Sequence, residues 1–433
     1  MWRAELITQN GDVTEAKIVI TTREHLWWLL VEAAELEHMI MCQYLFAEFS
    51  LKSGEDEGLT AEQAEAVDRW RKTISGIAVE EMLHLALVYN VLTAIGGAPP
   101  FNRPNFPQLS GYFPAKLQLD LLPFGERALQ QFLYLERPEG MERQQAEGFV
   151  PMAPPREQVS HDEIMPRSQE FSTIGQLYRG LAQGLRDLVE RLGEEAVFIG
   201  MPNAQATPEL FHWPQLIAVT DLESAVAAVE EIIEQGEGAR GDWQQAHYGR
   251  FLAMWEEYNA LRSRDPSFEP ARPILPAFSR QPFDITAERV IISDPLTARV
   301  AEVTSLAYEV VLHVLLRFFT HTDETREQLS TLVDAAIDLM ASVLRPLAVS
   351  LTTLPIGPAH PDHTAGFGFE MFYPMSNAVP WRKPVWTLLH ERITLLATSC
   401  AELAAVHPAA PPAVREAAER AAAIAATLAA QLD

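Results

Sequence analysis

The sequence predicts an all-α protein: a four-helix bundle with long irregular crossovers, followed by a second, mostly helical region packed on it. Three observations predict this architecture. Long segments carry apolar residues at spacings of three and four, which is the period of an amphipathic helix. Capping signals mark where these segments start, and proline-rich stretches separate them. Since the chain has 433 residues, we expect two or three domains with cores large enough to need no disulfides.

Charge and cysteine content narrow the classes of partner and location. The formal net charge of −26 would repel phosphate backbones and anionic lipids, so we expect no nucleic-acid partner. The two cysteines form no metal or disulfide spacing, which favours a reducing, cytoplasmic location. The N-terminus has no secretory signal pattern, and no uncharged apolar run approaches about 20 residues, so we expect no membrane span.

The first long helix is predicted to start at the capping pair Thr21-x-x-Glu24. Its core-facing stripe consists of Leu26, Leu29, Leu30, Ala33, Glu37, Ile40, Met41 and Tyr44. Glu37 therefore lies among core residues, where an unpaired carboxylate is costly and needs a compensating partner. His38 points about a quarter turn away, so we expect it to be structural or, at most, to lie beside a ligand.

The second long helix runs from the capping box at Thr60 to the glycine pair after Ile95. Glu81 and His84, three residues apart, share its apolar face, so both should point into the core. Carboxylate-bridged di-iron and di-manganese bundles use such Glu-x-x-His pairs. A buried ion pair, or a histidine hydrogen-bonded in an ordinary core, would explain this helix equally well. Glu37 on the neighbouring helix shifts the balance towards a metal site.

Residues 99–168 are rich in proline, and we expect an irregular crossover with one short helix from Glu126 to Glu136. A connection this long often carries function, such as a lid over a site. The candidates for lining a pocket beneath it are Tyr112, Phe113, Tyr134, Glu136 and Arg137. Packing of the crossover onto the bundle is the simpler explanation for each of them.

The third helix is predicted from Ser172 to Gly193, with Tyr178 facing inward and Gln176 where a helical ligand would stand. Tyr44 and Tyr178 are candidate pocket residues, as is Gln176, although a glutamine is a poorer ligand than a carboxylate.

The fourth helix is predicted to begin at a capping box at Thr220 and to resume after a glycine-rich interruption. Glu230, Glu234 and Glu237 share a face that borders the apolar stripe, and we expect at least one of them to face solvent. Beyond the interruption, Gln244-x-x-His247 stands where a second Glu-x-x-His pair would complete a symmetric site.

We expect a domain boundary in the proline-rich linker 263–290, which separates a bundle domain, 1–262, from a C-terminal helical domain, 291–433. The C-terminal helices are predicted at Pro295–Phe319, Glu327–Leu351, Pro384–Val406 and Pro411–Leu432. Between them, the segment with His360, His363 and Glu370 is expected to be a surface loop.

Several of these motifs occur together, in the same order, in one known family. They are ELEHMIMCQYLFAEFSLK, IAVEEMLHLALVYNVLTAIGGAPPFNRPNFP, TIGQLY, EEIIEQGEG and HYGRF. Over roughly residues 20–260 the chain resembles the ferritin-like domain of iminophenyl-pyruvate dimer synthases, also called chromopyrrolate synthases. These longer enzymes belong to violacein, rebeccamycin and staurosporine assembly. The resemblance implies a ferritin-like bundle and a metal-dependent oxidative role in secondary metabolism.

By position in the resembling motifs, Glu37, Glu81 and His84 match the first half of a ferritin-like ligand set. The family commonly has a glutamate where this chain has Gln176, so a mononuclear or asymmetric site is an alternative to a symmetric di-iron centre. The full set of metal-ligand candidates is Glu37, Glu81, His84, Glu234, Glu237 and His247.

The resulting expectation is an oxidoreductase whose mono- or dinuclear iron reacts with dioxygen or peroxide and converts a small amino-acid-derived substrate. Manganese is an alternative metal, and the residues leave zinc, copper and haem open. A homo-oligomer is compatible with the sequence. A non-catalytic metal-binding or storage protein is the alternative function, and a purely structural helical protein in which Glu81 and His84 satisfy each other is the third.

Overall fold

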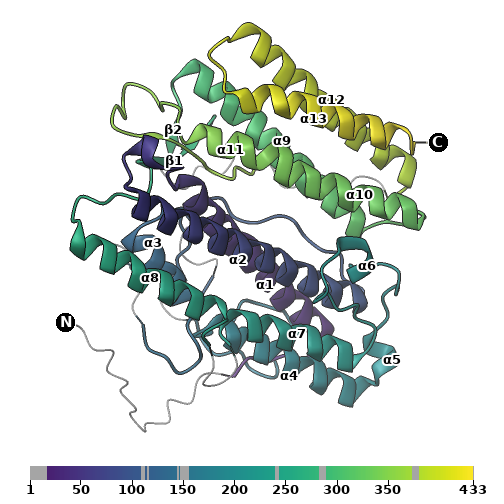
Figure 1. Ribbon diagram of the computed structural model, residues 1–433. Coiled ribbons are helices and arrows are strands. Elements are labelled where there is room, and N and C mark those ends of the chain that lie inside the picture. The colour runs from purple at the N-terminus through teal and green to yellow at the C-terminus, as the bar shows by residue number, and fades with distance from the viewer. Residues whose placement is uncertain are drawn as a thin grey trace.

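The computed structural model describes residues 17–108, 113–114, 117–143, 146, 156–238, 243–281, 289–372 and 380–432. Helices dominate it, as the sequence predicts (Figure 1). The N-terminal helices are α1 (Arg23–Ser50), α2 (Ala61–Ala94), α3 (Glu126–Leu135), α4 (Ile174–Leu192), α5 (Glu194–Val197), α6 (Pro208–Phe211), α7 (Leu222–Gly236) and α8 (His247–Arg264). The short 3-10 turn η1 (Glu55–Glu57) lies between α1 and α2.

Capping side chains set the starts of these helices close to the predicted positions. The capping box of α2 joins Thr60 and Gln63, as predicted. The N-cap of α1 is Thr22 rather than Thr21, and that of α7 is Asp221 rather than Thr220. In both corrected cases two adjacent residues have oxygen-bearing side chains, and the backbone selects the second one as the cap.

The third column of the bundle consists of two half-length helices, α3 and α4, that run antiparallel to α1. At one end, the Phe124 amide donates to Ser50 Oγ at 2.9 Å, which places the start of α3 beside the end of α1. At the other end, Arg191 donates to the Thr21 carbonyl at 2.5 Å, so α4 ends beside the start of α1. The short helix predicted in the crossover therefore belongs to the bundle.

The fourth column is divided in the same way into α7 and α8, which follow one another along α2 (Figure 1). Near the start of α7, Asn90 on α2 donates to the Ile217 carbonyl at 2.9 Å. Beyond the end of α8, Gln63 donates to Asp265 at 2.9 Å. Two continuous helices thus face two interrupted ones, and the interruptions lie near the middle of the bundle.

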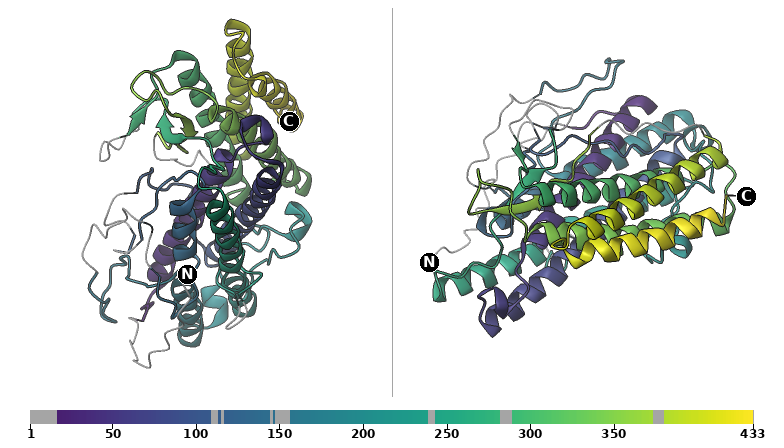
Figure 2. Two further views of the ribbon diagram at one scale, coloured as in Figure 1. Left: turned by 60° about the vertical axis from the view of Figure 1, so that its left-hand side comes forward. Right: turned by 90° about the horizontal axis from the view of Figure 1, so that it is seen from above.

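The C-terminal region places a second set of helices on α1 and α2. They are α9 (Pro295–Phe319), α10 (Arg326–Asp338), a π-helical segment (Leu339–Leu344), α11 (Arg345–Leu351), α12 (Arg382–Val406) and α13 (Pro412–Ala429). Seen from above, α12 and α13 lie side by side on the outside of the molecule (Figure 2). The apolar core runs without a break from α1 and α2 into α9 and α10.

A small parallel sheet of order β2-β1-β3 corrects two expectations. Its strands are β1 (Ile274–Phe278), β2 (Val290–Ile291) and β3 (Thr364–Phe367). β1 lies inside the expected linker and β3 inside the expected surface loop, with Ile274 paired to Thr364. Proline and glycine in these segments are typical of loops, whereas pairing between residues ninety apart is invisible to a local pattern. The division into domains 1–262 and 291–433 stays a prediction.

Among the described helices, α2 is long and apolar enough to pass a membrane-span test based on length and composition. Of its most apolar window, 83% is buried inside the protein. This burial is that of a core helix, which passes the same test.

Candidate metal centre

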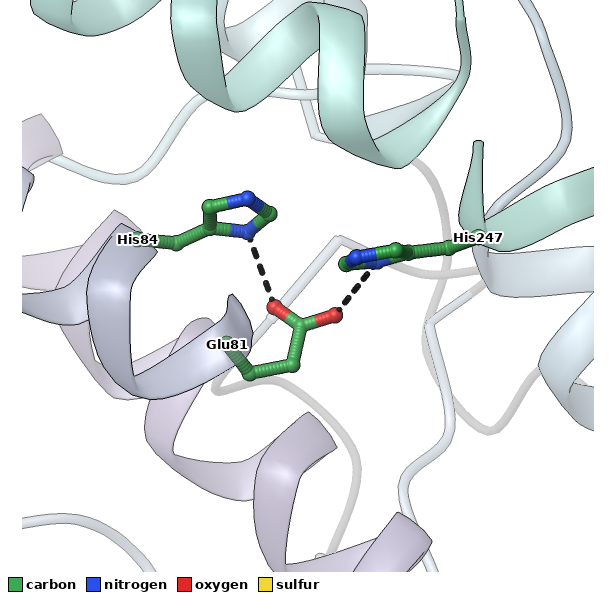
Figure 3. A group of neighbouring side chains, drawn as sticks. All are labelled: Glu81, His84 and His247. Carbon is green, nitrogen blue, oxygen red and sulfur yellow. Dashed lines mark hydrogen bonds and ion pairs between the residues drawn. The ribbon is translucent and has the colours of Figure 1, made fainter. Parts of the chain in front are cut away.

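Glu81 lies at the centre of a buried polar group inside the bundle, at the level where both interrupted columns break. One carboxylate oxygen is 3.0 Å from His84 Nδ1, and the other is 2.9 Å from His247 Nδ1 (Figure 3). Glu81 and His84 come from one face of α2, and His247 is the first residue of α8. The break in the fourth column therefore brings the second imidazole opposite the first.

The outer nitrogen of each imidazole is held by an oxygen acceptor. His84 Nε2 lies 3.1 Å from the Gln235 side-chain oxygen, and His247 Nε2 lies 2.9 Å from Glu80. These contacts fix the ring orientations so that both Nδ1 atoms point at Glu81. Metal-binding histidines are commonly held in this way, with one nitrogen engaged and the other directed at the ion.

Two further carboxylates flank Glu81, one on each side. Glu37 lies 3.6 Å from His84 Nδ1, and Glu136, the C-cap of α3, lies 3.7 Å from His247 Nδ1. Tyr178 donates a hydrogen bond to Glu37, and Tyr44 donates one to Glu136. The same set of carboxylate, imidazole and phenol thus occurs twice around Glu81, and the two imidazoles stack with ring centroids 5.2 Å apart.

Burial and mutual attraction set the charges of this group. Burial, followed by the nearby Glu81 carboxylate, raises the pKa of Glu37 to about 8. Burial also acts to raise the pKa of Glu81, but the His247 and His84 imidazoles hold it well below its usual range. Although burial opposes protonation of His84, Glu81 and Glu37 raise its pKa to about 10. The carboxylates are therefore compensated by positive charge on the imidazoles.

The residues fit a metal ion. One ligand atom each from Glu81, His84 and His247 lies within 4.8 Å of the others, and all three side chains are buried. His247 Nδ1 is buried and lies 2.9 Å from a Glu81 oxygen, but the angle between them is not that of a hydrogen bond. A buried nitrogen without a hydrogen bond is available to coordinate a metal ion. A divalent cation would supply the positive charge that protonated imidazoles otherwise provide. Nitrogen and carboxylate donors suit iron, manganese or zinc.

Comparison with known proteins gives the family of the chain. The family model described as ferritin-like matches residues 30–256, just over half of the chain. The chain belongs to the ferritin-like family. The match runs from within α1 to within α8, and so includes every residue of the buried group.

Two curated relatives are similar over most of the chain. Dichlorochromopyrrolate synthase from Lentzea aerocolonigenes is 29% identical over 85% of this chain and 39% of its own length. The 2-imino-3-(indol-3-yl)propanoate dimerase from Chromobacterium violaceum is 28% identical over 78% of this chain and 33% of its own length. The chain thus spans between a third and two fifths of the length of these relatives. A crystal structure of a ferritin-like protein from Caulobacter vibrioides aligns with a TM-score of 0.48 and 18% identity, covering 76% of this chain and 96% of that one.

Of the ligands expected from the sequence of this ferritin-like chain, four come together: Glu37, Glu81, His84 and His247. Glu234 is exposed on α7, so its assignment as a ligand is wrong. Glu230 is exposed as well, in agreement with the expectation that at least one glutamate of this face meets solvent.

Glu237 lines the cavity, but its carboxylate is already bound to other groups of the protein. It forms an ion pair with Arg179 and accepts a hydrogen bond from the Glu139 amide at 3.1 Å. The Cβ of any residue larger than glycine at position 175 would collide with its carboxylate. Glu237 therefore closes the group rather than joining its centre.

The other candidate pocket residues separate into two sets. Tyr44 and Tyr178 contact the flanking carboxylates directly. Gln176 does not line the cavity: its side-chain oxygen accepts from the Ser172 backbone amide at 2.5 Å, and its backbone amide donates to Thr173 Oγ1 at the start of α4. His38 points to a different side of α1, where Nε2 meets the Tyr308 hydroxyl at 2.6 Å.

Sequence reasoning undervalued Glu136 and missed Glu80 and Gln235. The sequence favours simple packing for Glu136, one of the crossover candidates, because a short helix in a proline-rich crossover does not reveal which column it joins. Of the same candidates, Phe113, Tyr134 and Arg137 are buried, Arg137 also lines the cavity, and Tyr112 lies outside the described residues. The adjacent pair Glu80-Glu81 was the available signal for a carboxylate beside a ligand.

Proposed function

We propose that this chain is a metal-dependent oxidoreductase of secondary metabolism, with non-haem iron as its metal, acting on a small amino-acid-derived molecule. Dioxygen or peroxide would be the oxidant. The observation that carries the proposal is the buried Glu81–His84–His247 group, with both Nδ1 atoms directed inward and both outer nitrogens engaged.

Glu81, His84 and His247 would hold the metal, with Glu37 and Glu136 available on its two sides. Bound iron supplies the electron-transfer chemistry by which dioxygen or peroxide oxidises organic substrates. The chain's own contribution is positioning: the two phenol hydrogen bonds orient the flanking carboxylates, and Ile40, Leu135 and Ile232 supply apolar wall between the charged groups.

The size of the central cavity constrains where each reactant binds. Its volume is about 30 Å³, which is room for a water-sized molecule and not for an amino-acid-derived one. We therefore expect the oxidant to enter the cavity and the organic substrate to bind at its rim, beside Arg137 and Glu237. Both line the cavity, and the Glu139 amide, in the segment that follows α3, donates to Glu237.

The substrate class comes from the names of the two curated relatives, one of which is a dimerase of an imino acid that carries an indole ring. We propose an α-imino acid derived from an aromatic amino acid for this chain too. A non-catalytic iron-binding protein is the alternative, and it differs from the enzyme in lacking turnover.

The first test is elemental analysis and a visible spectrum of the full chain purified without chelator, together with its Glu81→Gln variant. We expect one or two irons per chain in the parent protein and almost none in the variant, with equal helix content by circular dichroism. Oxygen uptake is then followed with 2-imino-3-(indol-3-yl)propanoate generated from tryptophan by an added amino-acid oxidase, and the oxygen consumed by the oxidase alone is subtracted. Iron without imine-dependent oxygen uptake would support the non-catalytic alternative, and absence of any transition metal would overturn the proposal.

A further inference from the structure

A second cavity, of about 300 Å³, lies on a different side of α1 from the metal centre, between α1 and α2 and the C-terminal helices α9 and α10. Glu37 and Ile40 face the metal centre, whereas His38 and Met41 line this second cavity. One helix therefore separates the two. No part of the metal-centre argument uses this cavity, so it calls for an explanation of its own.

The walls of the cavity are overwhelmingly apolar. They include several aromatic rings, among them Tyr89, Phe101 and Phe319, and methionines from both halves of the protein. Aromatic rings bind flat apolar surfaces well, and methionine adapts its shape to a ligand. The charged side chain in the lining, Arg345, is paired with Glu48 at 2.7 Å. Arg345 is therefore engaged, and the Arg103 guanidinium behind the lining is held by the Tyr308 hydroxyl and by the Pro104 and Phe369 carbonyls.

The cavity has a polar floor and an open mouth. At the floor, the buried Tyr308 hydroxyl meets His38 Nε2 at 2.6 Å and accepts from Arg103 Nη2 at 2.8 Å and from Arg103 Nε at 3.2 Å. At the mouth, Val79 on α2 is 42% exposed, and Ala341 in the π-helical segment is exposed. A small molecule can thus enter between these two helices and reach this floor, where a polar group of the ligand would replace one of the three bonds to the Tyr308 hydroxyl.

The π-helical segment shapes this mouth. Leu339–Leu344 form wider turns that end two residues before Pro346, which lacks the N–H that a regular α-helix would need there. Met340, Ala341 and Leu344 from this segment line the cavity. Short π-helical turns are frequent at functional sites because they redirect side chains towards a ligand.

Size and polarity together specify a class of ligand. An apolar cavity of about 150 Å³ accommodates one benzene ring, and this one has about 300 Å³. We propose that it binds a neutral two-ring aromatic molecule bearing one hydroxyl or N–H group, with that group at the Tyr308–His38 floor. The site is independent of the metal centre and goes beyond the oxidoreductase proposal.

The test is isothermal titration of the full chain with 2-naphthol, compared with 2-naphthoate, which has the same rings and a negative charge. We expect saturable 1:1 binding of 2-naphthol and at least tenfold weaker binding of 2-naphthoate. Ala341→Trp, which blocks the mouth at an exposed position, should weaken 2-naphthol binding at least tenfold. The matched control is Ser342→Trp, because Ser342 is the next residue but does not line the cavity; it should bind as the parent chain does.

A second variant tests the floor. Tyr308→Phe should reduce the preference for 2-naphthol over naphthalene while leaving naphthalene binding nearly unchanged. The proposal is overturned if 2-naphthol does not bind, if Ala341→Trp binds it as well as the parent chain, or if 2-naphthoate binds equally well. Repeating the titration with Glu81→Gln separates the two sites: undiminished binding is expected there, whether or not the chain binds iron.

Discussion

The metal centre and the aromatic cavity are both buried against α1, yet one is crowded with charge and the other is almost purely apolar. The metal centre lies where two columns of the bundle are interrupted: Glu136 caps α3, and His247 starts α8. The aromatic cavity lies between α1, α2 and α9, which run past it unbroken. Helix ends leave backbone groups unsatisfied and carry polar side chains. A break in a helix therefore places polar groups in the core, whereas a continuous amphipathic helix presents an apolar face to it.

Two neighbours on α1 illustrate the same contrast. Burial raises the pKa of Glu37 to about 8, with the Glu81 carboxylate adding to the effect. Burial lowers the pKa of His38 well below its usual range, and the Arg103 guanidinium adds to it. Both groups are therefore driven towards neutrality by burial, and what distinguishes the metal centre is the supply of oppositely charged partners around Glu81.

The largest expected effect is the loss of metal on removing the carboxylate that sequence reasoning undervalued. Glu136→Ala should reduce bound metal to a small fraction of the parent level, because Glu136 faces the same space as His247 Nδ1. Metal content after dialysis against a weak chelator measures it. Glu234→Ala, a glutamate to alanine change at an exposed position, is the control and should keep its metal. Equal loss, or equal retention, in the two variants would contradict this ligand set.

The next prediction concerns a buried carboxylate without imidazole partners. Glu370 is 1% exposed and accepts hydrogen bonds from Ser279 and Ser305, and burial raises its pKa from 4.5 to about 7. A raised acid pKa means that the folded state binds the proton more tightly. Its stabilising contribution is complete below pH 4.5 and is lost as the pH rises to about 7.

Glu370→Gln should therefore flatten the pH dependence of the free energy of unfolding between pH 4.5 and 7, by up to about 3 kcal/mol. Urea unfolding midpoints at several pH values measure the slope. Glu391→Gln on α12, which is exposed, is the control and should leave the slope unchanged. An unchanged slope in Glu370→Gln would mean that this carboxylate is ionised throughout the range.

A smaller effect is expected from the residue that orients His247. Glu80→Ala removes the acceptor of His247 Nε2 without touching the inward nitrogen. Loss of such a partner typically weakens metal binding about 10- to 100-fold. Competition with a chromophoric chelator would measure the change, with Glu256→Ala, exposed on α8, as the control. Unaltered affinity in Glu80→Ala would show that packing alone orients the ring.

The smallest expected effect is a change in stability when a larger side chain is placed in the aromatic cavity. Ala86→Leu adds three carbons to a side chain that lines it, and should stabilise the fold by about 1–2 kcal/mol through added apolar burial. Ala47→Leu, at a fully buried position on α1 outside either cavity, should instead destabilise it by about 1–3 kcal/mol through overpacking. Thermal unfolding distinguishes the two signs. Destabilisation by both variants would mean that the cavity cannot accept the extra carbons.

The sequence by itself determined the helices and half of the metal centre. Periodicity and capping depend on residues within a few positions of one another, so α1, α2, α9 and α12 were predicted to within a few residues at their ends. The same local geometry placed Glu37 on one apolar stripe and Glu81 with His84 on another. These are statements about a single helix face, and they need no knowledge of what that face meets.

Only the tertiary structure decided which parts of the chain meet. Whether Glu136 belongs to a loop or to the bundle, and which glutamate of the α7 face turns inward, depends on how separate columns align. The pairing of β1 with β3 and the cavity between α2 and α9 likewise join residues far apart in sequence. Local spacing fixes the direction of a side chain relative to its own helix axis, but its neighbours are chosen by long-range packing.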